Sequence, residues 1–190
     1  MTSWLKGAAP AALLALAGAA AAAPLVPLPT REFNAAALRA ESQLRVQAGQ
    51  PLRVEFHRAQ GFRSAGGTII VSLLAWPEGG AARCVLALEQ GGAPQLIDAL
   101  AEDQGQPWSC DGEPALAAAD VDGDGAEDLL VLYPYRPPSN ERFMLPLLLR
   151  QQAAHGGFAL DAERTRWLRQ GARLPADLKQ MRQTLRDYPR

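Results

Sequence analysis

Polar and apolar side chains alternate over residues 43–57. Leu44, Val46 and Ala48 occupy alternate positions, and the alternation resumes after the turn-forming residues 49–51 with Leu52, Val54 and Phe56. A period of two places every second side chain on the same face of a strand. The pattern therefore predicts a β-hairpin with one buried face.

Four further apolar runs predict strands, because they are rich in β-branched and aliphatic residues and are bounded by turn-forming residues. Pro146 interrupts the last run, and a proline within a sheet is confined to an edge or a bulge because it has no N–H to donate. We therefore expect an edge or bulge at Pro146. The four runs are residues 66–76, 83–90, 128–135 and 142–151.

Helical patterns are confined to the two ends of the chain. Asn34 is a suitable N-cap for a short helix over residues 34–41, with Phe33 packing onto Leu38. Near the C-terminus, apolar residues recur at helical spacing and predict a helix that packs onto a sheet: Leu174, Leu178, Met181 and Leu185. The expected fold is mainly β with short terminal helices.

The first 23 residues have the pattern of a secretory signal peptide. One positive charge, Lys6, precedes an uncharged run of alanine and leucine whose small residues suit cleavage. A transmembrane anchor is the alternative, but an alanine-rich run is weakly hydrophobic and has no basic flank after it. We therefore expect a periplasmic or secreted protein without a membrane span after cleavage, with one domain over residues 24–190.

The chain has two cysteines, Cys84 and Cys110, and two histidines, His57 and His155. In an oxidising compartment an even number of cysteines favours one disulfide, and two buried free thiols are the alternative. Without a C-x-x-C pair, the sequence offers no set of four zinc ligands.

Charge is unevenly distributed along a chain whose formal net charge is −1. Between Cys84 and Tyr135 the sequence contains many acidic residues and no lysine or arginine, so this region favours a cation. From Asp161 to Arg190, eight basic residues stand against four acidic ones. We interpret the basic segment as a solvated helical face near the acidic region, with contact to a membrane surface or a polyanion as the alternative. The overall charge gives no reason to expect nucleic acid.

The densest acidic motif runs from Asp120 to Asp128. Asp120, Asp122 and Asp124 are two residues apart, Gly125 follows, and Asp128 comes four residues after Asp124. Calcium binds six to eight oxygens, and a tight loop can supply them when alternate side chains point inward. We therefore predict a calcium site formed by the side chains of Asp120, Asp122, Asp124 and Asp128 and the carbonyl group of Ala126. The alternative is a turn whose carboxylates extend into water.

An EF-hand does not fit this motif, because its last position would fall on Val131 and an apolar β-prone run follows in place of a helix. The pattern D-x-D-x-D-G-x-x-D followed by aliphatic residues resembles the FG-GAP or VCBS-type repeat, the calcium loop of a β-propeller blade known from integrin α subunits. Residues 85–96 and 147–160 are similar to the strands and turns around such loops. The resemblance implies the same five calcium ligands and a role in adhesion or ligand binding.

A propeller normally contains several blades, each with its own loop. This sequence has a single copy of the loop, so we expect one blade-like antiparallel sheet around it and no complete propeller.

The sequence contains none of the common hydrolase, metalloprotease, P-loop or dinucleotide-binding motifs. Glu113 and Glu127 are the acidic residues that could form an acid–base pair, and Tyr133, Tyr135 and Arg136 could form an aromatic contact surface, unless Tyr133 belongs to the core. We therefore predict an exported, non-catalytic calcium-binding module with an unidentified protein or glycan partner. A calcium-dependent hydrolase is the alternative.

Overall fold

The computed structural model describes residues 25–98, 102–103, 106–137, 139, 141–152, 157–171 and 174–189. The expected signal peptide lies outside the described residues. Two helices and twelve strands precede the C-terminal helix among the described residues. In chain order the elements are β1 (Val26–Pro27), α1 (Thr30–Ala48), β2 (Leu52–Arg63), β3 (Ile69–Pro77), β4 (Arg83–Glu89), β5 (Gln95–Asp98), β6 (Glu102–Asp103), β7 (Gln106–Pro107), β8 (Ser109–Cys110), β9 (Ala115–Ala119), β10 (Asp128–Arg136), β11 (Phe143–Gln151), β12 (Phe158–Leu160), α2 (Ala162–Gln170) and α3 (Leu178–Arg186).

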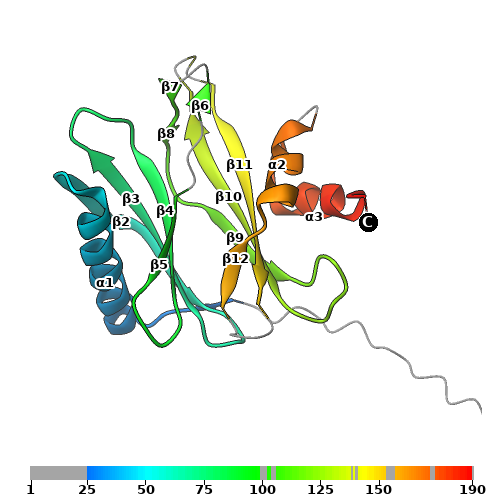
Figure 1. Ribbon diagram of the computed structural model, residues 1–190, viewed down its shortest axis with the longest axis horizontal. Coiled ribbons are helices and arrows are strands. Elements are labelled where there is room, and N and C mark those ends of the chain that lie inside the picture. The colour runs from blue at the N-terminus through cyan, green and yellow to red at the C-terminus, as the bar shows by residue number, and fades with distance from the viewer. Residues whose placement is uncertain are drawn as a thin grey trace, which may run out of the picture.

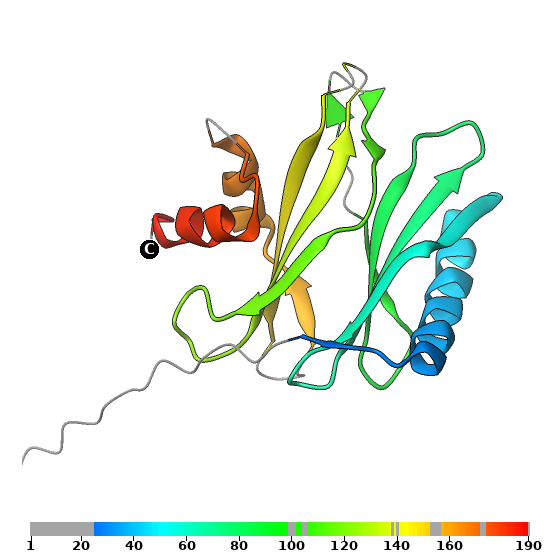
Figure 2. The same cartoon turned by 180° about the vertical axis from the view of Figure 1, so that it is seen from behind.

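Two antiparallel sheets pack face to face, with helices on both outer faces (Figure 1). The first sheet has the order β1-β2-β3-β4-β5, and the second has the order β12-β11-β10-β8, with β9 also paired to β10. α1 covers the outer face of the first sheet, and α2 and α3 cover the outer face of the second; Figure 2 shows the same layers from behind. The class predicted from the sequence, mainly β with helices towards the ends, is confirmed.

The second sheet is blade-like in its connectivity. β9, β10, β11 and β12 are neighbours in space in the order in which they follow in the chain, and all pair antiparallel. The acidic loop joins β9 to β10, one of the two inner strands of this meander. The described residues form no closed propeller.

β10 is a continuous apolar strand because it is buried on both faces. Alternate side chains such as Leu129, Val131 and Tyr133 face the first sheet, while Leu130 and Leu132 face α2 and α3. A strand covered on both sides needs apolar residues at every position, so its sequence does not alternate. Tyr133 and Tyr135 are at most 1% exposed, which assigns them to the core and contradicts the aromatic contact surface.

The hairpin predicted over residues 43–57 is wrong, because α1 continues to Ala48. Leu44 is buried with Ala40 on the helix face that packs against the first sheet, whereas Val46 is 76% exposed. Gly49 ends the helix with a φ of 61°, a left-handed conformation that glycine adopts without steric cost. Only the second half of the predicted hairpin, from Leu52, is a strand.

The predicted start of the first helix is also wrong. α1 begins at Thr30, and Pro29 occupies the N-cap position in place of Asn34. Leu38 is 62% exposed, so it does not form the predicted contact with Phe33, which packs towards the first sheet. The alanines at positions 36, 37 and 40 are buried against the first sheet and allow α1 to lie close to it.

Pro146 lies where β11 has no neighbouring strand on its outer side, since β12 pairs only with Leu149–Gln151. The backbone of Leu148 bonds outward, to the Thr165 hydroxyl and to the N–H of Asp161. Backbone groups alternate in direction along an antiparallel strand, so Pro146 also faces outward and removes no bond between β10 and β11. The predicted edge position is confirmed.

Three of the four residues in the C-terminal apolar stripe form α3 as predicted, whereas Leu174 precedes the Asp177 N-cap and packs against the core between the sheets. Met181 and Leu185 are buried against the second sheet, and Leu178 packs beside them. Asp177 caps this helix by accepting a hydrogen bond from the Gln180 N–H at 2.8 Å. No helix among the described residues has the length and apolar character needed to cross a membrane.

Candidate metal site

Three carboxylates converge in the loop between β9 and β10. One oxygen from each of Asp120, Asp122 and Asp124 lies within 4.8 Å of the others. Two carboxylates about 5 Å apart repel by roughly 3 kcal/mol at an effective dielectric constant of 20. The arrangement therefore favours a positive charge at its centre.

Backbone hydrogen bonds hold this loop in a tight turn. The Asp120 carboxylate accepts from the N–H groups of Gly123 and Gly125, at 2.6 and 3.0 Å. The carboxylates of Asp122 and Asp124 accept from the N–H groups two residues further on, at 3.2 and 2.8 Å. Gly123 and Gly125 have φ values of 82° and 83°, which other residues adopt only with strain. The glycine positions thus explain why the carboxylates can gather.

Asp128 is separate from this group of three. It is the first residue of β10, is 1% exposed, and accepts a hydrogen bond from the Val121 N–H at 3.2 Å. Burial, together with the charges of Asp122 and Asp124, raises the pKa of Asp128 to about 6, although the Val121 bond and Arg150 act against the shift. A cation bound nearby would favour the ionised carboxylate.

Two arginines supply positive charge to the loop. Arg150 of β11 forms ion pairs with Asp122 and Asp124, the second at 2.9 Å, and its Nε lies 3.9 Å from Asp128. Arg164 of α2 lies 3.5 Å from Asp122 and 3.2 Å from Asp161. Both guanidinium groups are partly solvent-exposed, so each pair contributes at most about 1 kcal/mol.

The sequence identified the acidic residues of this site but not Arg150. The structure brings together Asp120, Asp122 and Asp124, places Asp128 beside them, and engages Ala126 through its N–H to Asp124. Leu129 pairs with Leu149, so Arg150 follows on the strand next to Asp128. Arg150 could have been assigned to the site by pairing the predicted strand at residues 128–135 with the one at residues 142–151 in this register. Arg164 agrees with the expectation that the basic segment packs near the acidic region.

The three converging carboxylates could hold a metal ion. Carboxylate oxygens are the ligands that calcium prefers, and it requires six to eight of them. The three converging carboxylates can supply part of that number, and carbonyl groups or water would supply the rest. A cation here would share the carboxylates with Arg150 or displace it.

Comparison of the chain with models of protein families, with curated proteins and with solved structures found no match.

Proposed function

We propose that this protein is an exported, non-catalytic calcium-binding module of structural or ligand-binding role, with one FG-GAP/VCBS-like loop. The observation that carries the proposal is the convergence of Asp120, Asp122 and Asp124 within 4.8 Å at the start of a buried strand. The Ala126 carbonyl and Asp128 complete the proposed ligand set. The ion would hold the loop against the start of β10. This strand packs against the first sheet on one face and against α2 and α3 on the other.

Export is supported by the bond between Cys84 and Cys110. Disulfides persist in oxidising compartments such as the periplasm and the extracellular space, and are rare in the cytosol. Millimolar calcium also occurs outside the cell, where modules with dissociation constants of about 0.1–1 mM are saturated. In this proposal the ion is a stabilising component, and a protein or glycan partner binds elsewhere on the module.

We expect calcium to raise the melting temperature of the chain from residue 24 onward. At about 5 mM calcium and a dissociation constant of about 0.1–1 mM, binding adds about 1–2 kcal/mol to the free energy of unfolding. That corresponds to a shift of several degrees for a domain of this size. Thermal melts in excess chelator and then in calcium measure it directly.

The matched variants for this melt are Asp120→Asn and Asp124→Asn, which should lose the shift. Glu78→Gln changes an exposed acidic residue in the turn between β3 and β4, and should retain it. A calcium effect of equal size in all three variants would show that the ion acts elsewhere on the protein. Absence of any shift in the parent would remove the proposed site.

We also expect Arg150→Gln to tighten calcium binding about fivefold. The guanidinium occupies the carboxylates that the ion needs, and removing a unit charge about 4 Å from the ion is worth about 1 kcal/mol or more. The same variant should melt at a lower temperature in chelator, because the carboxylates then lack a counter-charge. Calorimetric titration measures the affinity.

Arg182→Gln is the control for Arg150→Gln, since Arg182 is an exposed arginine of α3. It should leave the calcium affinity unchanged. If Arg150→Gln binds calcium no more tightly than the parent, Arg150 and the ion do not compete.

A further inference from the structure

A cavity of about 290 Å³ lies at the side of the sandwich where β5 ends the first sheet. Its walls come from four elements: Asp98 of β5, Leu147 of β11, Leu160 of β12, and one side of α2. None of these residues belongs to the acidic loop. The cavity is thus a second candidate binding site with its own chemistry.

Two arginines of α2 give this cavity a positive lining. Arg166 and Arg169 are three residues apart, so they lie on one side of the helix. The Nε of Arg169 donates to the Pro146 carbonyl at 3.2 Å, which fixes this half-buried side chain against the edge of β11. Arg166 is exposed and forms no ion pair among the described residues.

The one acidic residue among the described lining does not cancel these charges. Asp98 forms an ion pair with Arg83 of the neighbouring strand β4. Its negative charge is therefore already matched by a positive charge from within the first sheet. A guanidinium group binds a carboxylate or phosphate through paired hydrogen bonds, so the natural ligand group for this lining is an anion.

Thr165 adds a neutral donor to the same wall. Its side chain is nearly fully buried, at 5% exposure, and its hydroxyl oxygen accepts a hydrogen bond from the Leu148 N–H at 3.0 Å. A hydroxyl group can accept and donate at once. Among the described residues its proton has no acceptor, so it can donate to a bound ligand.

Apart from Gln170, the rest of the described lining is apolar. Leu147 belongs to the core between the sheets, and Leu160 is 42% exposed at the end of β12, which is unusual for a large aliphatic side chain in this protein. An inorganic anion would leave this surface in contact with water. A ligand with a short hydrocarbon part would cover it.

We propose that this cavity binds a small aliphatic carboxylate. Its anionic end contacts Arg166, Arg169 and Thr165, and its hydrocarbon part lies against Leu147 and Leu160. The site does not depend on calcium. Its volume accommodates a molecule of a few carbon atoms, at the small end of the range for ligand pockets.

The test is calorimetric titration of the chain from residue 24 onward with hexanoate, up to about 20 mM, in the presence of chelator. We expect saturable binding, with hexanamide at least about tenfold weaker because it lacks the charge. Acetate should also bind more weakly, because it lacks the hydrocarbon part. Failure of hexanoate to bind, or equal binding of hexanamide, would overturn the proposal.

Arg166→Gln should weaken hexanoate binding about fivefold or more. Leu160→Ser should weaken hexanoate more than acetate. Arg182→Gln on α3, an equivalent loss of an exposed arginine, should bind hexanoate as the parent does. Thermal melts of each variant confirm folding, and equal affinity of Arg166→Gln and the parent would place hexanoate outside this cavity.

Discussion

Replacing Cys84 and Cys110 together by alanine is expected to lower the free energy of unfolding by about 3–4 kcal/mol. The disulfide closes a loop with a sequence separation of 26, and the chain-entropy model gives a stabilisation of this size for such a loop. Both cysteines are buried in the core between the two sheets, so the replacement also removes packed sulfur atoms.

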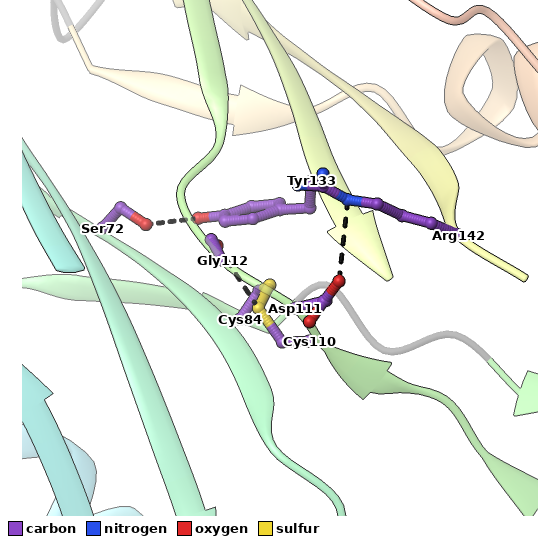
Figure 3. The surroundings of a disulfide bond; sticks show 7 residues. All are labelled: Ser72, Cys84, Cys110, Asp111, Gly112, Tyr133 and Arg142. Carbon is purple, nitrogen blue, oxygen red and sulfur yellow. Dashed lines mark hydrogen bonds and ion pairs between the residues drawn. A yellow bond between two sulfur atoms is a disulfide. The ribbon is translucent and has the colours of Figure 1, made fainter. Parts of the chain in front are cut away.

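The position of the disulfide explains why its loss should affect the whole fold. Cys84 lies in β4 of the first sheet and Cys110 in β8 of the second, with their Cα atoms 5.4 Å apart. The N–H of Cys110 also donates to the Ala82 carbonyl at 2.8 Å. Figure 3 shows Tyr133 beside this bond, reaching from the second sheet towards Ser72 of the first. The disulfide thus links the two sheets directly, through β4 and β8.

Urea unfolding of the parent with and without reductant measures this effect, and the double variant serves as the control. Reductant should lower the midpoint of the parent and leave that of the Cys84→Ala/Cys110→Ala variant unchanged. An identical midpoint for oxidised and reduced parent would show that the bond contributes nothing to stability.

Raising the pH from 9 to 11 is expected to lower the free energy of unfolding by about 3 kcal/mol. Burial raises the pKa of Tyr135 to about 12, and burial raises that of Tyr133 further. Both values exceed the ordinary tyrosine pKa of about 10 in the unfolded chain. Stability is therefore fully present below pH 10 and is lost as the pH rises towards the folded values, because only the unfolded chain releases its protons.

Each of these two tyrosines contributes about 1.4 kcal/mol of the loss by pH 11. Urea unfolding at pH 9, 10 and 11 measures it, and the Tyr133→Phe/Tyr135→Phe variant should show a much flatter dependence. Tyr188→Phe is the control for a phenol outside the core: the hydrogen bond to Glu163 raises the pKa of Tyr188 as well, so this replacement should flatten the slope much less than the double variant does. A parent whose stability is the same at pH 9 and 11 would contradict the burial of the two phenols.

The two long strands of the second sheet, β10 and β11, could be predicted because each is a run of apolar residues bounded by turns, whereas the shorter strands β8, β9 and β12 were not predicted. The alternation at Leu44, Val46 and Ala48 was misleading, since three apolar residues with a spacing of two occur in helices as well as strands. The helix is favoured over a strand by the packing of the α1 alanines against the first sheet, which is a tertiary interaction. Short patterns carry no information of that kind.

The site was predicted only in part, for a similar reason. Asp120, Asp122 and Asp124 are close in sequence, so their spacing alone indicates that they meet. Arg150 and Arg164 reach the same loop from β11 and α2, and the sequence separation hides that contact. The cavity beside Arg166 could not be predicted from the sequence, because its lining depends on the positions of four elements, β5, β11, β12 and α2.

The proline at position 146 has a consequence for how copies of this protein meet. Pro146 has no N–H to donate to a strand of a neighbouring molecule aligned with the outer side of β11. The carbonyl group of Pro146 already accepts a hydrogen bond from Arg169. Thr165 and Asp161 engage the backbone groups of Leu148 in the same way. This edge is therefore protected against strand-to-strand association, and we expect that copies of the protein do not extend the second sheet from that side.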